Sequence, residues 1–171
     1  MTQQVDSTQL DELDQRISRL SPGAGLTSVM GPGLEVALDD APLDQSDTAD
    51  IDPNLLVVHQ GDIQAVVNAL WAGGAQGISL QNQRIVSTTG IKCVGNTVVL
   101  QGVPYSPPYR VRAVGNRATM YAALQASAGV QAYLDYTAAP YNLGWSLRAD
   151  PQAMLPSYAG SPTLQYATSA Q

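Results

Sequence analysis

The clearest pattern of apolar and polar positions lies in residues 54–71, which read NLLVVHQGDIQAVVNALW. The apolar run at residues 55–58 predicts a strand, and Asp62 is well placed as the N-cap of a helix that follows. The pair Gly73 and Gly74 is a typical helix stop. Between these ends, one apolar stripe with helical spacing is formed by Ile63, Val66, Val67, Leu70 and Trp71. The pattern predicts a strand that leads into an amphipathic helix lying on a sheet.

Shorter alternating patterns on both sides of this unit predict further strands. Residues 34–39 alternate apolar and polar positions with a period of two, as a half-buried strand does. Residues 77–86 and 91–100 have the pattern of two hairpins, and Gly95 with Asn96 forms the turn of the second one.

The second half of the chain adds one more helical region between two strands. A strand is expected over residues 109–113, and a last short strand over residues 143–148. The helical region between them covers residues 118–136 and has a break near Gly129. Two helical segments separated by several antiparallel strands predict an α+β fold, in which the helices pack on a mixed, mostly antiparallel sheet.

A short coiled-coil-like helix precedes this fold, over residues 8–20. Its apolar residues are spaced three, four and three apart, which is the seam of a coiled coil: Leu10, Leu13, Ile17 and Leu20. Two heptads are too few to form a stable coiled coil alone, so the segment is either the end of a longer one or a single helix docked on the domain.

Three parts of the chain follow from these patterns. Residues 1–30 are expected to be the coiled-coil-like helix and a linker, residues 31–150 an α+β domain, and residues 151–171 a C-terminal tail. Within the domain, residues 39–53 form an acidic, proline-containing loop that lacks the glycine and the closing glutamate of a calcium-binding loop.

Composition excludes several classes of function. The 171 residues carry a formal net charge of −6, and an acidic chain is a poor binder of nucleic acid, because phosphate attraction requires a basic surface. A single cysteine excludes an internal disulfide. No apolar run approaches the roughly 18 residues of a membrane-spanning helix, and the polar start of the chain is not a signal peptide.

The sequence contains no recognisable catalytic, cofactor-binding or metal-binding constellation. His59 is the only histidine, and without a partner in the sequence it is expected to have a structural role rather than that of a general base. Cys93 alternates with Ile91 on one strand face, which favours a core thiol over a nucleophile. One histidine and one cysteine also argue against a metal site.

Surface contacts are the better candidates for function. Arg84, Arg110 and Arg112 lie in a stretch, residues 84–117, that contains no acidic residue, and their guanidinium groups suit carboxylates or phosphates of a partner.

Two tyrosines on the proline-stiffened segment PYSPPY join this candidate contact surface. Tyr105 and Tyr109 are suited to a protein interface, since their rings bury a large area at a low entropic cost. The alternation of the following strand places Tyr109 on the face opposite to Arg110 and Arg112. Tyr109 can therefore equally be a core residue, with the segment acting only as a connection.

Several segments of the chain together resemble one known family. They include VVNALW at residues 66–71, CVGNTV at residues 93–98 and PYSPPY at residues 104–109, and the resemblance covers residues 31–148. The family is the YlxW/YlxX-like group of uncharacterised proteins from actinobacteria and firmicutes, the domain of unknown function 881. The sequence departs from the family pattern at Gln60, where an acidic residue is expected beside His59.

The resemblance implies a place for this domain in the cell. Family members look like single-pass membrane proteins with a coiled-coil segment and this domain outside the membrane, and in firmicutes their genes lie near those for cell division and the cell envelope. We therefore expect a non-enzymatic scaffold at the cell membrane, attached through an upstream anchor. It would form a homodimer through the heptad segment and contact protein partners through a sheet edge or the PYSPPY segment.

Two other functions remain open. One is a sensor or ligand-binding ectodomain that uses Arg84, Arg110 and Arg112 to bind an anionic cell-wall fragment. The other, which has least support, is a hydrolase that uses Cys93 or His59. The resemblance supplies no catalytic residue for such an enzyme.

Overall fold

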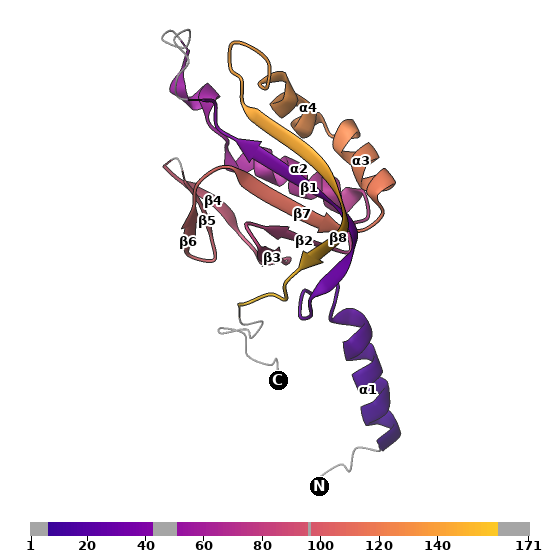
Figure 1. Ribbon diagram of the computed structural model, residues 1–171. Coiled ribbons are helices and arrows are strands. Elements are labelled where there is room, and N and C mark those ends of the chain that lie inside the picture. Colours follow the sequence, from indigo (N-terminus) through magenta and orange to yellow (C-terminus); the bar gives the residue numbers. More distant parts are fainter. Residues whose placement is uncertain (1–6, 43–50, 96, 161–171) are drawn as a thin grey trace.

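An antiparallel sheet of five strands forms the centre of the molecule (Figure 1). The computed structural model describes residues 7–42, 51–95 and 97–160. The strands lie in the order β3-β2-β7-β1-β8, and every pairing between neighbours is antiparallel. In chain order the strands are β1 (Val29–Asp39), β2 (Gly77–Leu80), β3 (Gln83–Ile85), β7 (Tyr109–Val114) and β8 (Gly144–Leu155).

The remaining three strands form a second, smaller sheet. It has the order β4-β5-β6, with β4 at Ile91–Val94, β5 at Thr97–Leu100 and β6 at Val103–Tyr105. Both hairpins predicted for residues 77–86 and 91–100 are confirmed, although Asn96 in the second turn lies outside the described residues. The sequence did not indicate β6, because Pro104 is unfavourable in a strand and is tolerated here only because β6 is an edge strand.

Three helices cover one face of the five-stranded sheet (Figure 1): α2 (Gln60–Ala72), α3 (Arg117–Ala126) and α4 (Ala128–Asp135). The core lies between these two layers. It is built from alternate strand residues and the apolar helix faces, among them Val36, Ile78, Val111, Ile63, Leu70, Met120, Leu124 and Val130. The predicted α+β class with helices packed on a sheet is confirmed.

The start of α2 differs from the prediction. Residues 55–58 do not form a strand: Pro53–Leu56 is a short 3₁₀ helix, η1, capped by the side chain of Asp52. The helix α2 begins after His59, and Asp62 is not its N-cap but its third residue, whose carboxylate accepts the backbone N–H of His59 at 2.8 Å. A proline near the start of a helical turn and an aspartate before it favour helix over strand.

The C-terminal end of α2 packs closely against the first turn of α3. The end of α2 at Gly73 is confirmed, and this glycine is needed because a Cβ there would lie 2.5 Å from the Cα of Met120. The hydroxyl of Thr119 donates to the Gly73 carbonyl at 2.6 Å, which fixes α3 against the end of α2. The break predicted near Gly129 in the second helical region is confirmed: it lies at Ser127, which ends α3 and caps α4.

β1 and the edge strand β8 beside it are longer than predicted. β1 begins at Val29, within the expected linker, and β8 continues to Leu155, so the domain boundary predicted at residue 150 falls inside a strand. Ala153 and Leu155 are buried with Val114 in a small second apolar cluster. This burial holds the end of β8 in the sheet, although Asp150 and Pro151 are unfavourable strand residues.

The helix α1 (Ser7–Leu20) stands away from the domain (Figure 1). None of its residues is buried, so the alternative of a helix docked on the domain is wrong for this structure. Its seam residues keep much of their surface in solvent: the exposed fractions are 51% for Leu10, 49% for Leu13, 58% for Ile17 and 66% for Leu20. Of the predicted acidic loop, residues 43–50 lie outside the described ranges.

Candidate functional site

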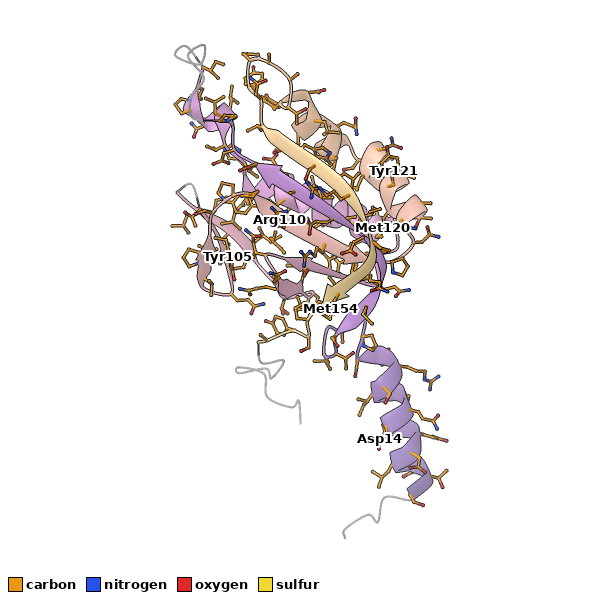
Figure 2. All side chains as sticks on the ribbon, in the orientation of Figure 1. Asp14, Tyr105, Arg110, Met120, Tyr121 and Met154 are labelled. Atoms are coloured by element: carbon orange, nitrogen blue, oxygen red, sulfur yellow. The ribbon has the colours of Figure 1, made fainter. Side chains whose placement is uncertain are left out.

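The sheet face opposite the helices carries a cluster of charged side chains. Arg110 of β7, which Figure 2 labels, and Arg112 two residues further along the strand lie on this face, as their alternation predicted. Both are bound by Glu35 of β1: Arg110 Nη1 lies 3.1 Å from Oε1, and Arg112 Nε lies 2.6 Å from Oε2. Residues 84–117 contain no acidic residue of their own. In the fold, Glu35 on the neighbouring strand lies directly opposite Arg112 and supplies the negative charge.

The two arginines change the titration of this carboxyl group. Burial raises the pKa of Glu35, but the hydrogen bond from Arg112 and the charges of Arg112 and Arg110 outweigh burial and hold the pKa below the ordinary value of 4.5. A lowered folded pKa means that the cluster stabilises the fold above pH 4.5 and loses this contribution as the pH falls through the folded pKa.

Arg148 of β8 completes the cluster without an ion pair of its own. It lies opposite Glu35 in the register of β1 and β8, yet both oxygens of that carboxylate are occupied by the arginines of β7. The side chain of Arg148 is exposed and makes no hydrogen bond or ion pair with any residue of the described ranges. With Arg110, Asp39 and Trp145 it lines a shallow hollow of about 260 Å³.

Arg148 was not among the residues predicted for the contact surface. Its signal is the alternation of Trp145 and Leu147 with Ser146 and Arg148, which is the pattern of a half-buried strand. It lies outside residues 84–117, the stretch without acids that pointed to the other arginines.

Arg84 is not a surface contact residue, which corrects the prediction. Its side chain is 1% exposed and its guanidinium group donates to three backbone carbonyls, those of Pro22, Thr27 and Pro156. Burial lowers the pKa of Arg84. Since those carbonyls belong to the segment after α1 and the segment after β8, Arg84 fastens both ends of the domain to β3.

Tyr109 is also buried, with 1% of its surface exposed, so it belongs to the core and not to a contact surface. Its hydroxyl donates to the backbone carbonyl of Tyr105 at 3.3 Å, and burial raises its pKa. Tyr105 remains partly exposed on the small sheet, where its hydroxyl accepts a hydrogen bond from Gln83 at 2.6 Å (Figure 2). The PYSPPY segment thus combines one core tyrosine with one that stays near the surface.

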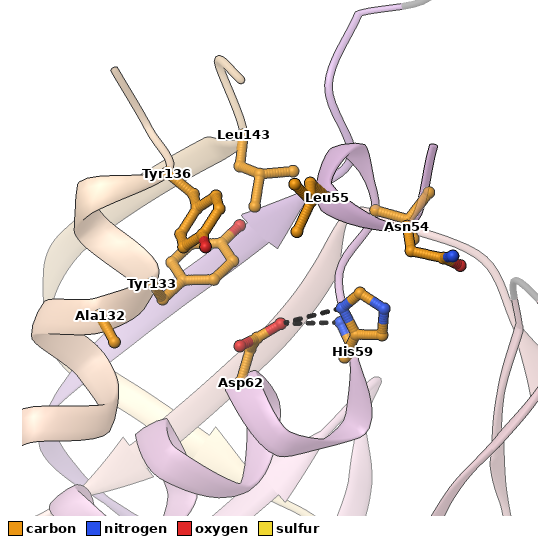
Figure 3. A pocket seen from close by; sticks show the side chains of 9 residues that line it. Asn54, Leu55, His59, Asp62, Ala132, Tyr133, Tyr136 and Leu143 are labelled. Carbon is orange, nitrogen blue, oxygen red and sulfur yellow. Dashed lines mark hydrogen bonds and ion pairs between the residues drawn. The ribbon is translucent and has the colours of Figure 1, made fainter. Parts of the chain in front are cut away.

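A pocket of about 220 Å³ lies at the start of α2 (Figure 3). Figure 3 shows His59 beside Asp62, with the ring of Tyr133 across the pocket from them. Nδ1 of His59 is 3.8 Å from Oδ2 of Asp62, the same oxygen that accepts the backbone N–H of His59. The Tyr133 hydroxyl donates to the carbonyls of Gly144, at 2.8 Å, and Asp39, at 3.4 Å, and burial raises its pKa.

These contacts give His59, Asp62 and Tyr133 structural tasks. His59 and Asp62 cap α2, and Tyr133 joins the facing ends of β1 and β8. Among the described residues, the ion pair of His59 is with an acid that also caps α2, so the structure assigns this pair a role in starting the helix.

Cys93 lies on β4 of the small sheet, partly buried against the core. Its backbone N–H donates to the side chain of Gln60 at 2.9 Å, so Gln60 links α2 to the small sheet. Within the described ranges, no three histidine, cysteine, aspartate or glutamate side chains gather to hold a metal ion. No helix in those ranges is long and apolar enough to cross a membrane.

Comparison with known proteins places this chain in a family. The profile of the family described as "Bacterial protein of unknown function (DUF881)" matches residues 16–168. The UPF0749 protein Rv1823 of Mycobacterium tuberculosis is 31% identical over 159 residues, which are 91% of this chain and 52% of the relative. The UPF0749 protein YlxW of Bacillus subtilis is 32% identical over 107 residues, 62% of this chain and 45% of the relative.

A solved structure has the same fold. The crystal structure of an uncharacterised conserved protein from Mycobacterium tuberculosis superposes with a TM-score of 0.68 at 21% identity, covering 91% of this chain and 99% of that one. The chain spans about half the length of the curated relatives it matches. The expected resemblance to YlxW is thereby confirmed, and the chain belongs to the DUF881 family of bacterial proteins of unknown function.

Proposed function

We propose that this domain is the non-enzymatic, extracytoplasmic part of a single-pass membrane protein that acts as a scaffold in the cell envelope or in cell division. In this proposal two copies pair through α1, and the domain contacts protein partners. The observation that carries it is the projecting α1, whose four seam residues stay about half exposed although the helix is regular. A seam of this kind is what a second helix covers in a parallel coiled coil.

The energy available from this seam indicates how such a dimer must be assembled. Full burial of a leucine or isoleucine side chain contributes about 1.5–3 kcal/mol, so covering these half-exposed residues on two helices contributes roughly 8 kcal/mol. Association itself costs about 4–15 kcal/mol. The described α1 alone therefore gives a weak dimer. In the proposal, further heptads and a membrane anchor in the uncovered half of the relatives' length strengthen it.

Localisation of the full-length protein in growing cells tests the scaffold function. A fluorescent tag on the end expected in the cytoplasm should give a membrane signal enriched at septa or growing poles. The variant Leu13→Glu/Ile17→Glu should lose this enrichment, because two charges in the seam oppose dimerisation, while Asp14→Lys on the flank should retain it. A cytosolic signal would contradict the membrane attachment, and a uniform membrane signal would contradict the division role.

A second candidate function is a sensor for an anionic cell-wall fragment, and the observation in its favour is Arg148. This guanidinium group and that of Arg110 line one hollow on the open sheet face, and Arg148 has no acid bound to it among the described residues. Co-sedimentation with purified anionic wall polymer tests it. Arg110→Glu/Arg148→Glu should abolish binding and Lys92→Glu, on the small sheet, should not. Equal binding by all three proteins would exclude this function.

A further inference from the structure

We propose that the free edge of β8, together with the groove beside it, binds an extended segment of a partner protein in which aliphatic and acidic residues alternate. The segment would add a sixth strand to the sheet. This contact would give the proposed scaffold its partner-binding surface, and it rests on that function for its biological setting only.

The first reason is the open strand edge itself. β8 ends the sheet order and pairs only with β1, so every second residue turns its N–H and C=O away from the sheet. Between Trp145 and Ala149, no hydrogen bond links β8 to an element other than β1 in the described structure. An edge of this kind is a template for an added strand.

The second reason is that the helical layer extends past this edge. In Figure 1, α3 and α4 lie on the side of β8 that faces away from β1. A groove of about 370 Å³ runs between them and the strand. It is lined chiefly by Tyr121, Leu124, Val130, Leu134, Trp145 and Leu147. Tyr121, which Figure 2 labels on α3, is 47% exposed, so apolar surface is left without a covering strand. Every second side chain of an added strand would enter this groove.

The third reason is charge. The remaining side chains of an added strand would lie on the open sheet face, next to Ser146 and Arg148. Among the described residues, no acid is bound to the Arg148 side chain: Arg110 and Arg112 occupy Glu35, and the next acid along the strand, Asp150, accepts the backbone N–H of Gln152. An acidic residue opposite Arg148 would therefore complement a free positive charge.

The sequence of β1, which already pairs with β8, shows which pattern of side chains fits beside this strand. On its paired side, β1 places Leu34, Val36 and Leu38 toward the helices and Glu35 opposite Arg148. The second edge presents the same side chains of β8, apolar ones toward the helices and Arg148 on the open face. The alternation of aliphatic and acidic residues in β1 is thus the pattern that fits the free edge as well.

Titration of the 15N-labelled full chain with a capped peptide of the β1 sequence, GLEVALD, tests this inference by NMR. We expect amide shifts and slowed hydrogen exchange along β8 and in α3 and α4. A peptide of the same composition in which the apolar and acidic residues do not alternate should bind at least about tenfold more weakly. Absence of β8 shifts at about 1 mM peptide would overturn the proposal.

Matched variants locate the contact. Arg148→Glu should weaken binding about tenfold, and a peptide with Glu35→Lys should restore it, whereas Lys92→Glu should leave binding unchanged. Tyr121→Glu places a charge in the groove at an exposed position and should also weaken binding. Equal binding by all variants would overturn the proposal. Since α1 is untouched, failure here leaves the proposed dimer standing, and loss of the dimer leaves the shifts on β8 unchanged.

Discussion

Replacement of Arg84 by methionine should destabilise the domain substantially. The substitution keeps an unbranched apolar stem and removes the guanidinium group that donates to the carbonyls of Pro22, Thr27 and Pro156. No carboxylate is bound to this buried cation in the described structure, and its Nε has no partner there. Within the described residues, the positive charge of Arg84 is therefore stabilised only by hydrogen bonds to these three carbonyl oxygens.

Two opposing terms set the size of the effect. Each hydrogen bond to a charged group contributes about 1.5–3 kcal/mol, so three bonds are worth roughly 4–9 kcal/mol. Removing the buried cation recovers its desolvation penalty, which is several kcal/mol. We therefore expect a net loss of about 2–4 kcal/mol in the free energy of unfolding, since the carbonyls are left without a donor in an apolar setting.

Urea unfolding followed by circular dichroism measures this loss as a lower midpoint at an unchanged slope. For a domain of this size, the melting temperature should fall by roughly 4–16 °C. Arg84→Lys should lie between the two proteins, because an ammonium group reaches fewer of the carbonyls. A methionine variant as stable as the parent protein would refute the reasoning and show that the three bonds do not exceed the cost of burying the charge.

Three further predictions concern single side chains. Glu35→Gln should destabilise the domain by about 1 kcal/mol at neutral pH, and the difference in unfolding free energy should vanish as the pH falls well below 4.5, since the Glu35 pKa is lowered. Asp40→Asn tests a pH dependence of stability with the opposite sign. Burial raises the Asp40 pKa against the opposing Val58 hydrogen bond, so the parent should gain stability relative to the variant as the pH falls toward 3.8. Tyr133→Phe should cost about 1–2 kcal/mol in thermal unfolding, because the Gly144 carbonyl loses its donor; equal stability would contradict that role.

Local sequence patterns correctly predicted the elements that are determined by residues close together in the chain. The stripe of α2 is buried at Ile63, Val66, Val67 and Leu70, and its glycine stop is in place. Trp71 of the same stripe is exposed. The expected strand at residues 55–58 is replaced by η1, and the backbone N–H of Val58 after it is bound by the side chain of Asp40, eighteen residues away. No local pattern reveals such a partner.

The arginines show the same limit for the candidate site. Arg84, Arg110 and Arg112 are alike in sequence, yet the first is enclosed by two distant segments and the other two share Glu35. Alternation correctly predicted the face of Arg110 and Arg112, because it depends only on strand geometry. Burial of Arg84 depends on where the chain closes over β3, which only the tertiary structure shows.

Pairing of two α1 helices is the central claim, and disulfide cross-linking in the full-length protein tests it most directly. In a Cys93→Ser background, Leu13→Cys occupies the seam and Gln15→Cys the opposite side of the same helix turn. Mild oxidation of membranes that contain each variant should give a covalent dimer with Leu13→Cys and none with Gln15→Cys. Equal cross-linking of both variants, or of neither, would contradict pairing through α1.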